Sequence, residues 1–355
     1  MRDYYVNGQQ VVDMVDLRSD TFTQPTAKMR EAMAHALVGD DVFEEDPTVK
    51  RLEELAAREV GKEAALFVVS GTMGNLVATL SHTQPGDEVI LGAHSHIYGY
   101  EVGGLARIGG LMPRLVDDTE GTIRPEQVLA ALREDNIHYP PTSLVCIENS
   151  HNMSGGRVTD VAGIQALATV VHKRGLKLHM DGARVFNAAT ALGVKATELT
   201  EPVDSVMFCL SKGLSAPVGS ILAGDAEFIA RARKFRKIVG GGMRQAGVIA
   251  AAGVIAIEEM IDRLKEDHAR AEWLAGGVSD IPGVQVIDSN YQTNILLIDI
   301  EETGLTAGQF VDKLDGLGVR VLTRSKIALR AVVHRHIDDE DVDKVITAFR
   351  EVAAV

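Results

Sequence analysis

Segments that predict strands alternate with segments that predict helices along most of the first 250 residues, and this alternation limits the possible folds. One helical pattern begins at Asp46 and Pro47 and ends at Gly61; another is capped by Asp160 and ends at Gly175. Strands separated by helices imply βαβ units. We therefore predict an α/β fold with a mainly parallel sheet and helices on both of its faces. The predicted strands cover residues 66–69, 88–91, 143–148, 176–180, 205–209 and 219–222.

The pattern changes near Ala246, where a long helical stretch begins and continues to about Ala275. The segments after it predict a compact α+β unit. We therefore expect a large α/β domain at residues 16–250, a small α+β domain at residues 251–355, and an N-terminal extension of fifteen residues without an evident role. The predicted elements of the small domain are strands at 284–287, 294–300, 319–323 and 327–333 and helices at 307–317 and 338–352.

Composition and charge exclude several classes of function. The net charge of −14 argues against binding to nucleic acid or to an anionic membrane. The N-terminus has no apolar leader, and the longest apolar run, residues 246–257, is too short to cross a bilayer. Cys146 and Cys209 each lie in an apolar run, which predicts two buried, reduced thiols rather than a zinc site. A soluble cytoplasmic enzyme is expected.

Lys212 is the strongest chemical signal in the sequence. It lies in Ser211-Lys212-Gly213, where the apolar segment 206–210 is expected to emerge into a turn. Desolvation can lower the pKa of a lysine at such a place, and a neutral amine forms Schiff bases with carbonyls, including pyridoxal phosphate (PLP). Most lysines only carry a solvated charge, so this interpretation requires the other parts of a PLP site.

The segment Ser70-Gly-Thr-Met-Gly-Asn75 is a candidate phosphate cradle. It follows a predicted strand and precedes an apolar helix. Small residues at such a turn expose backbone N–H groups at a helix N-terminus, which can bind an anion. An ordinary strand–helix turn would have the same sequence, so the phosphate site depends on the residues around it.

Asp181 and Arg184 follow the predicted strand 176–180 and are expected at the ligand-binding edge of the sheet. An aspartate there can pair with the pyridine nitrogen of PLP and keep it protonated. Arg184 could reach the ring hydroxyl or the phosphate. The alternative is an exposed Asp–Arg pair that contributes little energy.

Three histidines are candidates for chemistry or metal binding. His94 and His96 follow the strand 88–91, and a His-x-His pair can hold a metal. No third ligand lies at a convincing spacing, so we predict no metal. His96 is instead expected to stack on a cofactor ring or to act as a base, with simple packing as the alternative. His138 belongs to no local motif, and its spacing favours a structural role.

Two arginines are candidate anion-binding residues. Arg330 lies within an apolar strand, where its charge needs a partner. A substrate carboxylate would supply one through a bidentate contact, and an internal acid would serve equally well. Arg244 follows the flexible run Gly240-Gly-Gly-Met, from which it could reach a phosphate, including one in a neighbouring subunit.

Taken together, these segments resemble the L-threonine aldolases of the PLP-dependent fold-type I, aspartate aminotransferase-like superfamily. The match extends in family order from residue 16 to about residue 250, and Arg330 links the C-terminal unit to the family more loosely. The combination is highly specific, although no single motif is. The matching segments are Asp16-Leu-Arg-Ser-Asp-Thr21, Val38-Gly-Asp-Asp-Val42, Glu45-Asp-Pro-Thr48, Ser70–Asn75, Ser95-His96, Ile147-Glu-Asn149, Asp181–Arg184, Ser211–Gly213 and Gly240-Gly-Gly-Met-Arg-Gln-Ala-Gly247.

The resemblance implies a role for each residue of the cofactor site. Lys212 is expected to bind PLP covalently, with His96 stacked on the ring. Asp181 pairs with the pyridine nitrogen and Arg184 with the ring oxygen. These roles would make PLP the cofactor of the chain.

The phosphate of PLP is implied to lie against Gly71 and Thr72, with Arg244 donated across a subunit interface. Ser19 and Arg330 are implied to bind the substrate carboxylate. The family suggests a homotetramer, a dimer of dimers with shared active sites.

The activity implied is the retro-aldol cleavage of L-threonine, L-allo-threonine or related β-hydroxy-α-amino acids to glycine and an aldehyde. His138 matches a second active-site histidine of the family, so the catalytic candidates are Lys212, His96 and His138. The base could be either histidine or a water that they position. Another PLP lyase or transaminase reaction on the same scaffold is the alternative, and a PLP-binding protein without turnover is a more distant one.

One departure from the family pattern bears on substrate range. Phe43-Glu44 stands where the family usually has Tyr-Gly. A hydroxyl is lost and a charge is gained, which leaves the choice between threo and allo substrates open.

Overall fold

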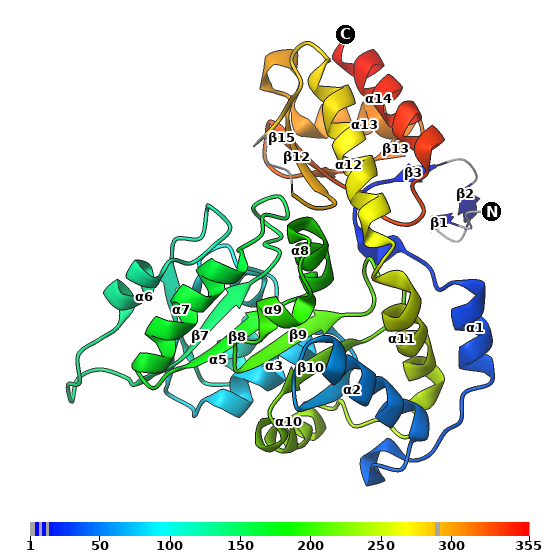
Figure 1. Cartoon of the computed structure of the whole chain (residues 1–355). Coiled ribbons are helices and arrows are strands. Elements are labelled where there is room, and N and C mark those ends of the chain that lie inside the picture. The colour runs from blue at the N-terminus through cyan, green and yellow to red at the C-terminus, as the bar shows by residue number, and fades with distance from the viewer. Residues whose placement is uncertain (1–3, 7–8, 12–13, 288–291, 355) are drawn as a thin grey trace. The chain divides into compact units, whose positions relative to one another are not determined.

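The computed structural model describes residues 4–6, 9–11, 14–287 and 292–354 (Figure 1). The chain divides into two compact units, Gln24–Asp262 and Met1–Thr23 together with Arg263–Val355. This division differs from the predicted boundary at residue 250, because the helix Gly247–Met260 packs against helices near the start of the larger unit. Residues 16–23 group with the C-terminal unit, since the strand β3 (Val15–Asp16) pairs in parallel with β13 (Val319–Arg320).

A seven-stranded sheet forms the centre of the larger unit, in the order β4-β10-β9-β8-β7-β5-β6. β10 runs antiparallel to both of its neighbours, and the remaining pairs are parallel. The predicted α/β fold with a mainly parallel sheet is therefore confirmed. The strands are β4 (Ala64–Val68), β5 (Glu88–Gly92), β6 (Met112–Val116), β7 (Thr142–Glu148), β8 (Lys177–Asp181), β9 (Ser205–Cys209) and β10 (Ser220–Gly224).

Helices cover both faces of this sheet. In Figure 1, α7 and α9 lie on one face, and α3 and α10 lie on the other. The helices of the unit are α1 (Ala27–Ala34), α2 (Pro47–Glu59), α3 (Gly71–His82), α4 (His96–Gly99), α5 (Gly104–Arg107), α6 (Pro125–Ala131), α7 (Val161–Lys173), α8 (Val185–Leu192), α9 (Ala196–Thr200), α10 (Ala226–Ile238) and α11 (Gly247–Met260), with the 3₁₀ turn η2 (Asp41–Phe43).

Local signals set the ends of several helices where the sequence predicts them. The Asp46 carboxylate accepts hydrogen bonds from the N–H groups of Thr48 and Val49, and Pro47 occupies the first position of α2. Asp160 caps α7 in the same way through Gly163. Gly175 follows α7 with φ of 70°, a conformation that glycine adopts without steric cost.

The predicted continuous helix from 246 to 275 was wrong, because the chain turns between Met260 and Leu264. α11 ends at Met260, and α12 (Leu264–Ser279) begins after three intervening residues. The two helices pack in different units: α11 against α1 and α2, and α12 against α14 (Asp339–Ala353). Two separate cores therefore bury the two helices.

The smaller unit has a four-stranded sheet in the order β11-β12-β15-β14. Residues 319–323, predicted as one strand, form two short strands: β13 pairs with β3, and β14 pairs with β15. A core of aliphatic side chains with Phe310 and Phe349 joins the sheet to its helices. The remaining elements are β1 (Tyr4–Val6), β2 (Gln9–Val11), β11 (Gln285–Val286), β12 (Ile295–Asp299), β14 (Leu322–Thr323), β15 (Ala328–Val332), α13 (Ala307–Gly316), η1 (Asp20–Phe22) and η3 (Glu301–Thr303).

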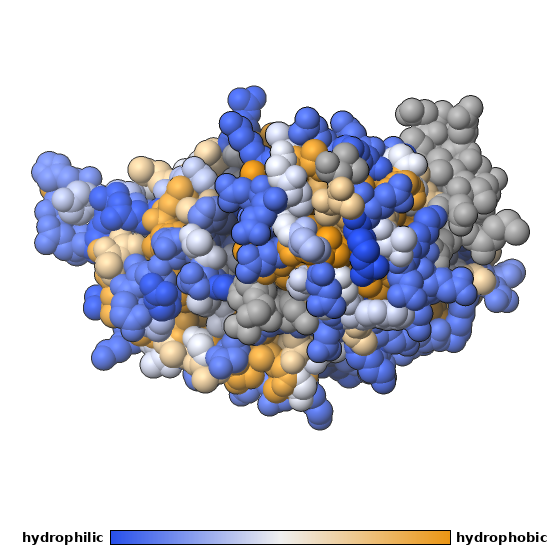
Figure 2. All heavy atoms as spheres, turned by 90° about the horizontal axis from the view of Figure 1, so that it is seen from above, coloured by the Kyte–Doolittle hydropathy of each residue, from blue (hydrophilic) through white to orange (hydrophobic). Residues whose placement is uncertain are grey.

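The exposed surface carries many polar residues. The face drawn in Figure 2 is mostly hydrophilic, with hydrophobic residues in smaller patches between the polar ones. Among the described residues, no helix combines the length and apolar character needed to span a membrane. Cys146 and Cys209 are both buried and free, as predicted, and burial raises the pKa of the Cys146 thiol.

Candidate functional site

The carboxyl ends of three neighbouring parallel strands bring the central residues of the site together. Glu148 ends β7, Asp181 ends β8, and Lys212 follows the end of β9 by three residues. The register pairs Glu148 with Asp181, and Asp181 with Met207 of β9. The edge that the sequence predicts for ligand binding therefore carries both a carboxylate and an amine.

Asp181 is a buried carboxylate held by two donors. The Asn75 side-chain amide donates to its Oδ2 at 2.8 Å, and the Ala183 backbone N–H donates to its Oδ1 at 3.0 Å. Only 2% of the residue is exposed. A buried carboxylate with fixed hydrogen bonds can pair with a protonated ring nitrogen, as predicted for Asp181.

Lys212 is half-buried and lies in the turn between β9 and β10, where the sequence places it. The backbone N–H of Ser215 closes this turn on the carbonyl of Lys212 at 2.9 Å, and Ser215 has φ of 65°. The positive charge of Lys212 acts to lower the pKa of His96, so the two side chains share one electrostatic environment.

The N-terminus of α3 forms a cradle of small residues beside β9. The Ser70 hydroxyl accepts from the N–H of Met73, so it caps the helix. A Cβ added to Gly71 would lie 3.0 Å from the sulfur of Cys209, and one added to Gly74 would lie 2.6 Å from Met207 Cγ. The helix start can lie this close to the sheet only with glycines, and its first N–H groups, at Gly71 and Thr72, are suited to an anion.

His96 begins α4 and is held by two glutamates. Its backbone N–H donates to Glu148 Oε2 at 2.7 Å, and its Nδ1 lies 3.0 Å from Glu101 Oε1. The hydrogen bond with Glu101 raises the pKa of His96 above its ordinary value, and burial opposes this effect. Because Nδ1 is engaged, Nε2 is the ring nitrogen left for a ligand.

Glu101 and Asn75 also belong to the site, although neither was predicted to act in it. Asn75 is fully buried on α3, and its amide donates to both Glu101 and Asp181. Burial raises the pKa of Glu101, and its hydrogen bond with His96 opposes this. Asn75 lies within the predicted phosphate segment, which is the only signal that points to it, and Glu101 has no motif of its own.

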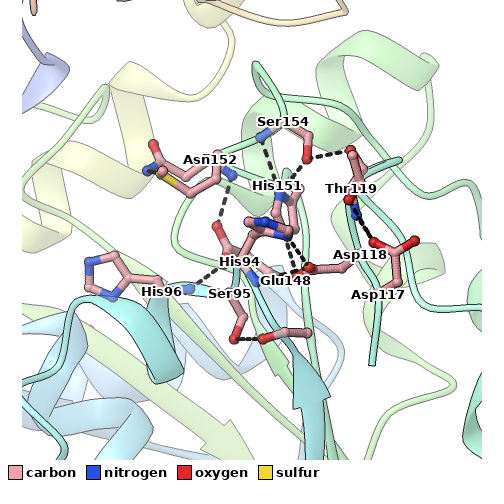
Figure 3. Close-up of polar contacts among 12 residues, drawn as sticks. His94, Ser95, His96, Asp117, Asp118, Thr119, Glu148, His151, Asn152 and Ser154 are labelled. Atoms are coloured by element: carbon pink, nitrogen blue, oxygen red, sulfur yellow. Dashed lines mark hydrogen bonds and ion pairs between the residues drawn. The ribbon is translucent and has the colours of Figure 1, made fainter. Parts of the chain in front are cut away.

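Side-chain atoms of His96, Glu101 and Asp181 lie within 4.8 Å of one another, a spacing that a metal ion could use. His94 does not join them: its Nδ1 contacts Asp118 at 2.8 Å, and Asp118 also contacts His151 at 2.9 Å (Figure 3). The two histidines of the His-x-His segment therefore belong to separate clusters.

Glu148 connects the backbone of His96 to that of Asn152. Its carboxylate accepts from the N–H groups of His96 and Asn152 (Figure 3), and burial raises its pKa. The side chain of Asn152 accepts from Arg184 at 3.2 Å. Arg184 is itself buried and begins α8, three residues after Asp181. Arg184 and Asp181 thus lie at the two ends of one connected polar network.

The structure places His138 and Arg244 away from this cluster within the chain. His138 is exposed in the loop before β7, at the amino end of that strand, whereas the site lies at the carboxyl ends. The fold of the single chain therefore does not bring His138 into this cluster, and its catalytic role remains a prediction. Arg244 is more than half exposed, and its guanidinium contacts Asp40 at 3.0 Å rather than the start of α3.

Ser19 and Arg330 belong to the smaller unit. Ser19 caps η1 and accepts a hydrogen bond from the N–H of Thr21. Arg330 is buried on β15 and donates to the carbonyl of Arg18 at 3.2 Å. The two residues lie in adjoining segments of that unit, and their role as the carboxylate site remains a prediction.

The residues of the larger unit fit the predicted cofactor. A half-buried amine at Lys212, a buried carboxylate at Asp181 and a glycine cradle at a helix N-terminus match the aldehyde, the ring nitrogen and the phosphate of PLP. The donors to Asp181 leave it able to accept one more hydrogen bond, as a pyridinium requires.

Solved structures share this architecture. The threonine aldolase of Leishmania major has a TM-score of 0.83 at 17% identity, over 96% of this chain and 99% of that one. Serine palmitoyltransferase of Sphingomonas wittichii has a TM-score of 0.76 at 18% identity, over 98% of this chain and 88% of that one. Likeness at these identities confirms the predicted fold type I.

Similarity in sequence identifies the family. The family model described as beta-eliminating lyase matches residues 16–302. Low-specificity L-threonine aldolase 1 of Arabidopsis thaliana is 45% identical over 346 residues, 96% of this chain and 97% of that protein. Low specificity L-threonine aldolase of Escherichia coli K12 is 41% identical over 339 residues, 95% of this chain and 98% of that protein. The chain therefore belongs to the beta-eliminating lyase family and, within it, to the low-specificity L-threonine aldolases.

Proposed function

We propose that the chain is a PLP-dependent lyase that cleaves L-threonine and L-allo-threonine to glycine and acetaldehyde, and related β-hydroxy-α-amino acids to glycine and the matching aldehyde. The observation that supports this most is the convergence of Lys212, Asp181 and His96 at one sheet edge. Family membership and the near-complete coverage of the relatives support the same reaction.

Lys212, Asp181 and the start of α3 would hold the cofactor at its aldehyde, ring nitrogen and phosphate. Bound there, PLP would supply a sink for the electron pair left at the substrate Cα. Asp181 would keep the ring nitrogen protonated by accepting its hydrogen bond, because two donors fix the carboxylate in place. Arg184 is proposed for the ring oxygen, and His96 for stacking on the ring.

His96 is the proposed acceptor of the proton on the β-hydroxyl. Its Nδ1 contacts Glu101, which directs the ring and leaves Nε2 free to take that proton. Loss of the proton lets the Cα–Cβ bond break as the Cβ–O bond becomes the carbonyl of the leaving aldehyde. The exposed position of His138 gives it no comparable part within its own chain.

Further parts of the proposal come from the resemblance to the family. Ser19 and Arg330 would bind the substrate carboxylate. Arg244 would reach the cofactor phosphate of a neighbouring subunit, and the exposure of its side chain in the single chain supports such a role. The assembly would be a homotetramer, a dimer of dimers. We place the enzyme in the cytoplasm.

Substitution of Lys212 tests the proposal. Lys212→Ala is expected to lower acetaldehyde release from L-threonine by at least about a thousandfold, since covalent binding of the cofactor is lost. Lys177→Ala is the matched control, because Lys177 lies at the opposite end of the neighbouring strand and pairs with Asp204. Equal activity of the two variants would contradict the proposal. Conversion of bound cofactor to its amine form would instead indicate a transaminase.

A further inference from the structure

A chain of buried polar side chains leads from Asp181 into the interior of the larger unit. It passes from Asn75 to His179 on β8, then to Ser205 on β9, and ends at His82 on α3. Asn75, His179 and Ser205 are fully buried. The proposed reaction uses none of the last three residues, so their burial calls for another explanation.

The orientation of Asn75 fixes the first links of this chain. Its Nδ2 donates to Glu101 Oε1 at 2.8 Å and to Asp181 Oδ2 at 2.8 Å, since a carboxyl oxygen at each of these positions accepts from the amide nitrogen. The amide therefore directs its nitrogen at the two carboxylates and its Oδ1 at His179. Because Oδ1 only accepts, His179 Nε2, 3.1 Å away, must carry the hydrogen.

The remaining links follow from the tautomer of His179. With the hydrogen on Nε2, its Nδ1 accepts from the Ser205 hydroxyl at 2.8 Å. The Ser205 oxygen then accepts from His82 Nε2 at 2.7 Å. Among the described residues, His82 Nδ1 has no hydrogen-bond partner, so the chain ends there.

Every donor in this chain points toward Asp181 and Glu101, although the chain carries no net charge. Burial lowers the pKa of His179 to about 3 and that of His82 to about 4, so both rings are neutral at physiological pH. Aligned hydrogen bonds polarise one another, and the positive ends of these dipoles face the two carboxylates.

We propose that His179 is a positioning residue that acts through Asn75 to hold the Asp181 carboxylate in place for the ring nitrogen of PLP. This inference rests on the proposed use of PLP but not on which bond of the substrate breaks. Its prediction concerns cofactor binding, so a different reaction would leave it intact.

Two substitutions at residue 179 separate positioning from packing. A glutamine side chain has a donor group and an acceptor, as the neutral imidazole does, whereas leucine fills the space without either. In titrations of the apoprotein with PLP, His179→Leu should bind about three to ten times more weakly than wild type. His179→Gln should stay within about twofold of wild type. Equal binding by the two variants would overturn the proposal.

A cofactor analogue tests whether the effect passes through the ring nitrogen. With 1-deaza-PLP, in which a carbon replaces that nitrogen, Asp181 has no ring donor to accept from. The difference in affinity between His179→Leu and His179→Gln should then disappear. A difference of the same size with both cofactors would show a general structural defect and would overturn the proposal.

Ser205→Ala provides a second route if His179→Leu does not fold. Loss of the hydroxyl frees His179 Nδ1, and PLP should bind about two to five times more weakly, again only when the ring nitrogen is present. Ser81→Ala is the matched control, since its buried hydroxyl donates to the carbonyl of Val77 on the same helix as His82. PLP binding by Ser205→Ala equal to that of this control would contradict the role of the chain.

Discussion

At the scale of single residues, hydrogen bonds within the protein determine which atoms of the site remain available to a ligand. The contact of His96 Nδ1 with Glu101 determines which ring nitrogen can take a proton. Asn75 connects Glu101 to Asp181, so the proposed base and the proposed cofactor anchor share one support. The pKa of His96 is raised by Glu101 and by the charge of Asp181 and is lowered by burial and by Lys212.

This balance predicts the pH dependence of the reaction. If neutral His96 takes the proton, kcat/KM falls as pH decreases through its pKa, which Glu101 raises from its ordinary value. Glu101→Gln removes the charge that stabilises protonated His96. The acidic limb of the profile should therefore move to lower pH in that variant, as measured by acetaldehyde release across pH. A limb that does not move would exclude His96 as the titrating group.

At the scale of elements, a buried ion pair joins α10 to the 3₁₀ turn before α2. Arg236 donates to Asp41 Oδ2 at 2.7 Å and to the carbonyl of Phe67 at 2.7 Å. The side chains of Arg236 and Asp41 are 2% and 3% exposed. Removal of one partner from such a desolvated pair lowers stability strongly, because the other charge stays buried without its partner.

Asp41→Ala should therefore lower the free energy of unfolding by about 3–5 kcal/mol, measured by chemical denaturation. Glu258→Ala is the control, since its pair with Arg51 is exposed and is expected to contribute less than about 1 kcal/mol. Similar losses in the two variants would mean that the Arg236 charge finds another partner or water.

Local sequence signals predicted the elements, and contacts between distant residues decided the rest. Asp46, Pro47 and Asp160 marked helix starts that the structure confirms, because capping acts within one turn. The break after Met260 has no glycine or proline to mark it. It arises from packing in two units, which no local pattern records.

In the candidate site, too, local sequence predicted some residues, and only the fold revealed others. Asp181 and Lys212 were predictable because each directly follows an apolar strand. His179 alternates with apolar residues in the same strand and shares a face with Lys177, which suggests exposure. α3 covers that face, and the partner Asn75 lies 104 residues away in sequence. Only the folded sheet brings the two side chains together.

At the scale of the whole molecule, the proposed assembly makes a specific prediction about Arg244. If Arg244 serves the site of a neighbouring subunit, Lys212→Ala and Arg244→Ala chains should complement each other. A hybrid pair would contain one site with both residues intact. Activity after co-refolding should rise well above that of either variant alone, and light scattering should give four times the mass of the chain. No recovery would place Arg244 in its own subunit's site or outside any site.

The stoichiometry of threonine cleavage tests the central claim most directly. Purified protein loaded with PLP would be mixed with L-threonine and, separately, with L-allo-threonine, and glycine and acetaldehyde would be measured together. We expect the two products in equal amounts from both substrates, and their relative rates would give the isomer preference. Absence of acetaldehyde despite the absorbance of bound PLP, or release of ammonia or an oxo acid instead, would contradict the aldolase assignment.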